Sequence, residues 1–314
     1  VVVRDSSVEY YPNLGRRFGS KVTMDNAPHL DAPERFDAGR LRLADIDGSG
    51  TTDILYLHAE GVRIAFNRSG DGWSDVSTVD PFPIDDVAAV QVADLMGSGT
   101  ACLVWSSSLP GDASSPMRYL PLMGDTKPHL MVRTVNNLGA ETHVDYASST
   151  AFYLRDRDAG CPWVTRLPFP VHVVERVQTF DRVSSSVFAS RYSYHHGFFD
   201  GVEREFRGFA RVEQYDTAQF DARTDMDPAN LDDQSSVPEV MTKTWFHTGA
   251  LVDARHVSDL LAGEYYREPG LDEGGAQDML LPDSQLPGEL SPEELREAMR
   301  ALKGSILRQE VYAL

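Results

Sequence analysis

The chain has 314 residues, of which 41% are hydrophobic and 25% charged, and its formal net charge is −19 at pH 7. This length predicts about two domains with buried cores. The surplus of carboxylates argues against nucleic acid, whose binding requires a basic surface, and against anionic membrane surfaces. Solubility is the simplest interpretation of the acidity. No apolar run in the sequence reaches the roughly 18 residues of a membrane-spanning helix.

Two cysteines are too few for a disulfide framework. Cys102 lies in an apolar run and is predicted to be a small buried hydrophobe, whereas Cys161 precedes a Pro-Trp pair in a loop. A bridge between them stays open, so cysteine usage does not decide the compartment. The chain shows neither an initiating Met nor a signal-peptide pattern, and it stops inside an apolar run. We therefore expect a fragment of a longer protein.

A short acidic loop at residues 45–53 organises the first half of the chain. Aspartates stand at its positions 1, 3 and 9, and two glycines between them allow the tight curl that a cation loop needs. A side-chain or backbone oxygen is available at positions 5 and 7. The predicted ligand set for a structural Ca²⁺ is Asp45, Asp47, Ser49, Thr51 and Asp53. The alternative is a tight turn whose Asp side chains accept hydrogen bonds from nearby backbone N–H groups. Both interpretations stay open.

The loop recurs 49 residues later, beginning at Asp94, with Met96 and Cys102 at positions 3 and 9. The second copy can keep the turn but cannot hold a metal. A second repeated pattern has Asn13 in one copy and Asn67, 54 residues later, in the other; in both copies a Gly and an aromatic residue follow. A period near 50 with several short strands per unit is typical of a β-propeller blade.

Residues 1–124 are therefore predicted to be C-terminal blades of a propeller. About two to two and a half blades fit, fewer than the roughly four that close a ring, so the other blades are expected outside this chain. The predicted strands are 8–11, 22–24, 40–44, 53–58, 62–67, 87–93, 102–106 and 117–122.

From residue 125 to 314 the pattern changes to longer strands. A hairpin is predicted from 130–135 and 141–146, with Gly139 in a left-handed turn position. A capped helical turn follows at 148–160, and strands at 171–181, 186–195 and 202–215 form an antiparallel meander. Alternation predicts a charged outer face carrying Glu203, Glu205, Arg207 and Arg211.

The last third mixes loops, strands and helices. Residues 216–240 and 264–290 are predicted loops, 241–247 and 306–313 strands, and 250–261 a helix. Ser291, Pro292 and Glu294 form a capping box that begins a helix running to about Lys303. The overall prediction is a mainly β protein with a few short helices.

No sequence motif for catalysis is present. His195 and His196 are neighbours, and adjacent residues of a strand point to opposite faces, so they cannot chelate one metal together without a bulge. The carboxylates from Asp200 to Glu205 are better explained as charge pairs beside a hairpin turn at 197–201. The four Trp residues are predicted to be core or interface anchors.

The acidic repeats, Asp-x-Asp-Gly-x-Gly-x-x-Asp before a strand, resemble FG-GAP/VCBS blades. Residues 166–175 (RLPFPVHVVE), 194–209 (YHHGFFDGVEREFRGF), 291–298 (SPEELREA) and 302–313 (LKGSILRQEVYA) carry a narrower resemblance. Together they resemble the middle region of the B component of bacterial insecticidal toxin complexes and of related Rhs-type and Salmonella-plasmid-virulence-B-type proteins. Ser49 and the Asp-poor second loop depart from the usual metal-binding blade.

The resemblance implies a role rather than a reaction. In that family a propeller docks the B component onto a pore-forming A component, and a β-sheet shell completed by the C component encloses an unfolded effector. We expect this chain to be a non-enzymatic scaffold and docking segment of a secreted toxin, binding proteins and neither nucleic acid nor membrane. Two alternatives stay open. A free-standing adhesion or glycan-binding propeller would not need residues 130–314, and an enzyme would need the carboxylates of the Asp200–Glu205 turn.

Overall fold

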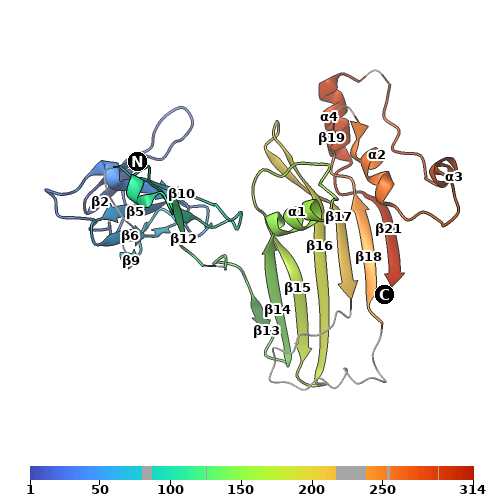
Figure 1. Ribbon diagram of the computed structural model, residues 1–314, viewed down its shortest axis with the longest axis horizontal. Helices are drawn as coiled ribbons and strands as arrows, with labels where there is room; N and C mark the ends of the chain where they lie inside the picture. The colour runs from blue at the N-terminus through green and yellow to red at the C-terminus, as the bar shows by residue number, and fades with distance from the viewer. Residues whose placement is uncertain (80–86, 125, 217–237, 253–254, 289) are drawn as a thin grey trace. The chain divides into compact units, whose positions relative to one another are not determined.

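The structure is a computed structural model that describes residues 1–79, 87–124, 126–216, 238–252, 255–288 and 290–314 (Figure 1). The chain divides into two compact units, Val1–Leu130 and Met131–Leu314. None of the helices in the described ranges is long and apolar enough to cross a membrane.

The first unit consists of antiparallel sheets in the orders β1-β2-β3, β4-β5-β6-β9 and β10-β11-β12, with a small β7-β8 ribbon. Its elements are β1 Val2–Arg4, β2 Ser7–Tyr10, β3 Val22–Thr23, η1 Ala38–Arg40, β4 Leu41–Ala44, β5 Asp53–His58, β6 Gly61–Ala65, β7 Asn67–Arg68, β8 Gly72–Trp73, β9 Ser77–Val79, β10 Ala89–Ala93, β11 Cys102–Ser106, η2 Pro110–Asp112 and β12 Met117–Pro121.

The central strand β5 is buried on both sides. Ile54 and Tyr56 belong to one hydrophobic cluster with residues of the first sheet, whereas Leu55 and Leu57 belong to another with Trp105 of the third sheet. The four-stranded sheet therefore lies between the other two, because alternate side chains of β5 fill different cores. Cys102 is buried, as the sequence predicted, and neither cysteine is in a disulfide bridge. The propeller arrangement of these sheets stays a prediction.

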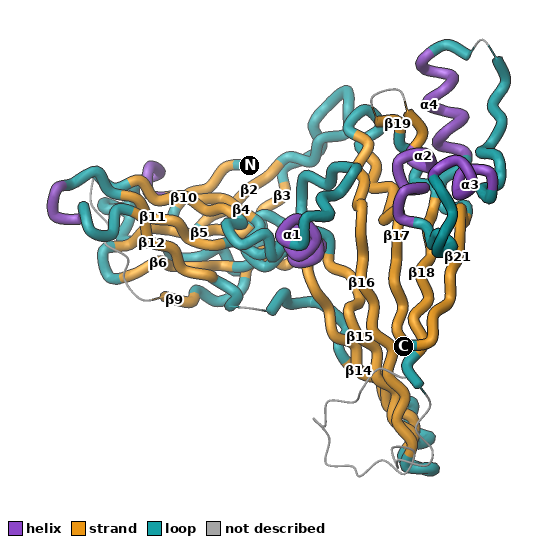
Figure 2. The backbone as a smooth tube through the Cα atoms, turned by 45° about the vertical axis from the view of Figure 1, so that its right-hand side comes forward, coloured by secondary structure: helices purple, strands orange, loops and turns teal. Residues whose placement is uncertain are grey.

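The second unit is built on one seven-stranded antiparallel sheet in the order β13-β14-β15-β16-β17-β18-β21. Its helices gather at one end of that sheet (Figures 1 and 2). The elements are β13 Arg133–Val135, β14 Ala140–Ser148, α1 Ser149–Asp158, β15 His172–Asp181, β16 Ser186–Asp200, β17 Glu205–Asp216, β18 Val240–Phe246, β19 Leu251–Val252, β20 Arg255–His256, α2 Val257–Leu261, η3 Ala262–Glu264, α3 Glu273–Asp278, α4 Pro292–Ala301 and β21 Ile306–Ala313.

Local capping chemistry located two helices well. Ser148 caps α1 by accepting a hydrogen bond from Thr150 N, and α4 has the complete capping box between Ser291 and Glu294. Gly139 adopts φ +107° in the turn between β13 and β14, as predicted.

Three sequence predictions in the second unit were wrong. Strand β16 continues through both histidines to Asp200, so the turn lies at 201–204 rather than 197–201. The helix predicted at 250–261 begins only at Val257, because Leu251 pairs with His256 in a hairpin. Helix α3 lies in a predicted loop, and its two glycines weakened the helical signal. Most of the predicted loop at 216–240 lies outside the described residues.

Candidate functional site

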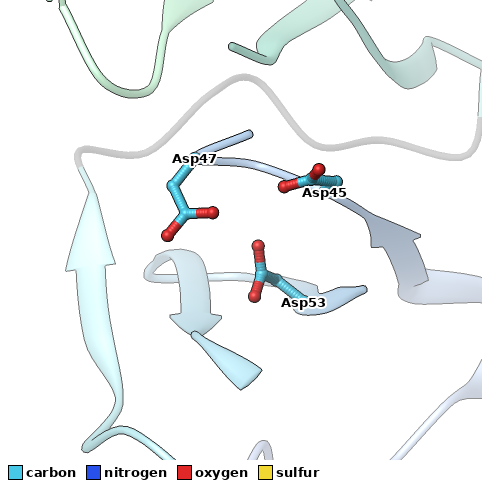
Figure 3. Close-up of side chains that lie close together, drawn as sticks. All are labelled: Asp45, Asp47 and Asp53. Atoms are coloured by element: carbon cyan, nitrogen blue, oxygen red, sulfur yellow. The ribbon is translucent and has the colours of Figure 1, made fainter. Parts of the chain in front are cut away.

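The acidic loop lies between β4 and β5, with Asp53 as the first residue of β5. Carboxylate oxygens of Asp45, Asp47 and Asp53 all lie within 4.8 Å of one another. Figure 3 shows the three side chains converging from the two ends of the loop. Asp45 is exposed, and the other two are buried. The structure thus brings together the three predicted acidic ligands.

The carboxylates of the loop accept hydrogen bonds from its own backbone N–H groups. Asp45 accepts hydrogen bonds from Ser49 N at 3.0 Å and Gly50 N at 2.9 Å, and Asp47 accepts one from Ser49 N at 2.9 Å. Gly48 and Gly50 adopt φ of +70° and +88°, which lets the chain curl around the carboxylates.

Asp53 connects the loop to a neighbouring segment. Its two oxygens accept hydrogen bonds from Ile46 N at 2.9 Å and Asn67 N at 2.8 Å. Burial raises the pKa of Asp53 above its ordinary value; the two backbone hydrogen bonds oppose this effect, and the nearby carboxylates of Asp47 and Asp45 add to it.

Two basic side chains contact the acidic loop, and sequence reasoning did not assign either of them to it. Lys127 Nζ donates to Gly48 O at 2.5 Å, and His129 Nε2 lies 2.7 Å from Asp47 Oδ2. Burial would raise the pKa of Asp47, but the hydrogen bonds from His129 and Ser49 outweigh it and hold the pKa below its ordinary value. Both residues lie about 80 positions from the loop in sequence, so no local pattern could have found them.

The second loop separates the roles of the aspartates. Asp94 accepts hydrogen bonds from Ser98 N at 2.9 Å and Gly99 N at 2.7 Å, matching the contacts of Asp45. Ser98 and Thr100 hydroxyls lie 3.0 Å apart, as Ser49 and Thr51 hydroxyls do at 2.9 Å. Because this copy lacks carboxylates at positions 3 and 9, the shared turn depends on the first aspartate and the glycines.

The donor set therefore fits a metal ion in part. Three convergent carboxylates suit Ca²⁺, but Lys127 already brings a positive charge to the loop. The backbone bonds to Asp45 and Asp53 also satisfy the alternative, a hydrogen-bonded turn. Calcium binding at Asp45, Asp47, Ser49, Thr51 and Asp53 stays a prediction, and any such ion would fix a turn rather than do chemistry.

In the second unit, Glu264 of η3 is the centre of a buried polar network. It accepts hydrogen bonds from His196 Nε2 at 2.8 Å, Arg211 Nη1 at 2.8 Å and Trp245 Nε1 at 3.0 Å. Burial would raise the pKa of Glu264, but the hydrogen bond and charge of His196, with Arg211 and Trp245, lower it to about 2. Glu264 thus ties η3 to β16, β17 and β18.

His195 has different partners from His196. Its Nδ1 lies 2.6 Å from Asp156 Oδ2 of α1, which also accepts from Trp163 Nε1 at 2.6 Å. Burial and the nearby Arg211 lower the pKa of His195. The two histidines bind separate carboxylates, and a register shift lies directly after them, between Gly197 and Phe199.

Arg207 is not on an exposed charged face, contrary to the sequence prediction. Its side chain is 0% exposed, pairs with Asp200 and Glu205, and donates to Gly249 O at 3.0 Å. The β16–β17 turn is also tied to α4, since Glu203 lies 3.3 Å from Arg296 Nη2 of that helix.

Alternation placed Ala210 on the face opposite Arg207, yet Ala210 is buried with three residues of the chain that returns over β17, Ala250, Val257 and Leu261. A register shift opposite Gly197–Phe199 and a φ of +89° at Gly208 interrupt the alternation.

A short repeat also escaped sequence analysis. The patterns Arg-x-Glu-x-Tyr at 211–215 (RVEQY) and 308–312 (RQEVY) lie on β17 and β21, in register on either side of β18. In both, the Tyr hydroxyl donates to the Glu carboxylate, at 2.9 Å and 2.5 Å. Lys243 of β18 lies between the two glutamates, 3.3 Å from Glu213.

The antiparallel sheets, joined by paired polar clusters, define a mainly β segment. Residues 73–249 match the family model described as "Insecticide toxin TcdB middle/N-terminal region". A "Photorhabdus luminescens Tc holotoxin pore" structure is 32% identical over 99% of this chain, with a TM-score of 0.82. A structure of TcdB2-TccC3 without its hypervariable C-terminal region is also 32% identical over 99%, with a TM-score of 0.81. No curated protein matches.

The chain belongs to this insecticidal toxin B-component family, because the family model spans more than half of it. It covers 14% of the length of each of the two solved chains. The match therefore identifies a segment, and the roles of the whole assembly come to this chain as proposals.

Proposed function

We propose that this chain is a non-enzymatic scaffold and docking segment of a secreted toxin-complex B component. The first unit, as part of a propeller, docks onto the pore-forming A component. The sheet of the second unit forms part of a shell that encloses the effector together with the C component. The observation that carries the proposal is the likeness of 99% of the chain, at a TM-score of 0.82, to a chain of a Tc holotoxin.

A protruding hairpin of the first unit supports protein docking. Tyr11, Leu14 and Phe18 are 47%, 57% and 71% exposed. Arg16 and Arg17 lie between them and are exposed. The hairpin is held internally by a bond from Leu14 N to Arg17 O at 2.9 Å. Aromatic and Arg side chains are enriched in the energetic centres of protein interfaces, so this ordered tip suits a protein partner.

The side chains that could act as catalytic groups form ion pairs with one another, and this supports a non-enzymatic role. Asp200 is paired with Arg207, His195 with Asp156, and His196 with Glu264. A cavity of about 510 Å³ in the first unit is lined by apolar and neutral polar side chains, with no Asp, Glu, His, Lys, Arg or Cys among them. A general acid or base needs reach to a substrate, and these groups face one another.

The docking proposal is tested by affinity measurements on the intact B–C assembly with purified A component. Replacing Leu14 and Phe18 by Ser should weaken binding about tenfold or more, as loss of an interface centre does, without lowering the melting temperature. The matched control replaces Leu138 and Val183, exposed by 83% and 81% in the second unit, by Ser. Failure of the wild-type assembly to bind the A component would contradict the docking role.

The calcium proposal is tested separately by thermal unfolding across a titration to millimolar Ca²⁺. Binding predicts a melting temperature that rises with ion concentration in the wild type and not in Asp47→Ala. A wild-type melting temperature that does not change with Ca²⁺ would contradict calcium binding and favour the hydrogen-bonded turn.

A further inference from the structure

The sheet of the second unit has two faces with opposite chemistry. Directly paired residues of antiparallel strands point to the same side, so the register from β13 to β21 assigns each residue to a face. Alternation is regular from the row of Ala140, Asp181 and Ser186 up to the row of Ser193, Glu213, Lys243 and Glu310, below the bulges near residues 197–199 and 245–246.

One face, the charged face, carries eight Asp, Glu, Arg or Lys residues among eighteen paired positions. They are Arg133, Glu141, Asp145, Arg176, Arg191, Glu213, Lys243 and Glu310. Several pair with one another or with a neighbour: Arg133 lies 2.6 Å from Glu141, and Lys243 3.3 Å from Glu213. The face is also closely packed, since Glu141 and Glu213 are only 4% and 8% exposed.

The opposite face, the uncharged face, has two charged residues among seventeen paired positions between those rows. Its members are Thr134, Ala140, Thr142, Val144, Val177, Thr179, Asp181, Ser186, Phe188, Ser190, Tyr192, Gln214, Asp216, Val240, Thr242, Val311 and Ala313. Both exceptions are engaged: Asp216 accepts hydrogen bonds from Ser190 Oγ at 2.8 Å and Gln214 Nε2 at 2.9 Å, and Asp181 accepts one from Ser184 Oγ at 2.7 Å.

The uncharged face is open in the described part of the chain. None of its seventeen residues is buried, and Phe188 and Val311 are 61% and 66% exposed. The helices of the unit gather at the opposite end of the sheet from the β15–β16 turn beside Phe188 (Figure 2). In a chain that is 25% charged, a solvated sheet face would alternate Lys and Glu with Thr. The lack of charge therefore indicates a contact surface.

The composition indicates which kind of partner fits. A permanent interface is more apolar and resembles a domain core, whereas here hydroxyl and amide side chains interrupt the valines. Thr, Ser, Tyr and Gln side chains can donate to a backbone C=O or accept from a backbone N–H. With only Asp181 and Asp216 as charges, both already hydrogen-bonded to neighbours, the face selects a partner weakly by charge. These properties suit weak contact with an extended polypeptide of any sequence.

We propose that the uncharged face is the wall that contacts the enclosed effector polypeptide, while the charged face points away from it. This inference rests on the proposed shell function and assigns its surface. Neutral contacts hold an unfolded chain loosely enough for release, because no ion pair has to be broken when a segment moves along the wall.

Site-specific photo-crosslinking on the intact, effector-loaded B–C assembly tests the assignment. A benzophenone amino acid at Phe188 should crosslink to the effector. The same amino acid at Val135, which is 48% exposed on the charged face at the same end of the sheet, should not. Crosslinks from Phe188 only to other parts of the toxin components or to a second copy, or equal effector crosslinks from both positions, would overturn the inference.

A second measurement uses charge without relying on crosslinking. With an acidic effector, Thr242→Lys should slow release and Thr242→Glu should hasten it, each by about threefold, the size of one partly screened charge interaction. Ser193→Lys and Ser193→Glu, on the charged face, are the matched controls and should leave release unchanged. Equal shifts from both Thr242 variants, or none, would contradict the assignment.

The experiments distinguish a failure of the proposed shell function from a failure of the assignment of the two faces. If the wild-type assembly leaves its effector open to protease, the shell function itself is wrong. If the effector is protected but the Phe188 probe does not reach it, only the assignment of the faces is wrong.

Discussion

Replacing Glu264 by Gln removes the charge at the centre of the buried network and keeps its shape. The wild-type carboxylate accepts three hydrogen bonds, from His196, Arg211 and Trp245. Its pKa of about 2, against an ordinary 4.5, means that the fold favours the charged form. The difference corresponds to about 3 kcal/mol. Since the side chain is 25% exposed, solvent screening leaves about 2 kcal/mol or more.

The pH dependence follows from the lowered pKa. The stabilisation by Glu264 is complete above pH 4.5 and is lost as the pH falls toward 2, because the unfolded chain takes up the proton first. Glu264→Gln should therefore be less stable than the wild type at pH 7, and the difference should shrink between pH 4.5 and 2.

Hydrogen exchange of the β17 and β18 amides is the suitable assay, because it reports the second unit separately from the first. Exchange at pH 7 should accelerate about thirtyfold or more in Glu264→Gln, the equivalent of about 2 kcal/mol. The control is Glu297→Gln, whose exposed pair with Arg300 at 3.3 Å should contribute below about 0.5 kcal/mol. Equal exchange in both variants would refute the network as a source of stability.

Three further substitutions give expected outcomes. Arg207→Ala should destabilise the second unit by roughly 3–5 kcal/mol in urea unfolding, because it leaves Asp200 buried without its partner. Gly249→Ala should lower the melting temperature, since φ is +70° and a Cβ would lie 2.8 Å from Met299 O, whereas Gly263→Ala, with open space around it, should not. In the first unit, Asp53→Ala should cost about 1–3 kcal/mol by leaving two buried backbone donors unpaired, and Asp53→Asn less, because it keeps an acceptor oxygen.

The sequence determined the features that depend on neighbours along the chain. The Asp/Gly pattern predicted the loops before β5 and β11, because an Asp side chain and the backbone N–H groups it binds lie within five residues. The capping box predicted the start of α4 for the same reason.

Only the tertiary structure decided what covers each face. Alternation placed Arg207 with the charged residues of β17, but its burial depends on chain from 247 to 304 that returns over the strand. In the same way, Lys127 and His129 complete the acidic loop from about 80 residues away. The uncharged face emerges only when the register of seven strands is known. Burial and partner choice are set by contacts distant in sequence, and local patterns carry no information about them.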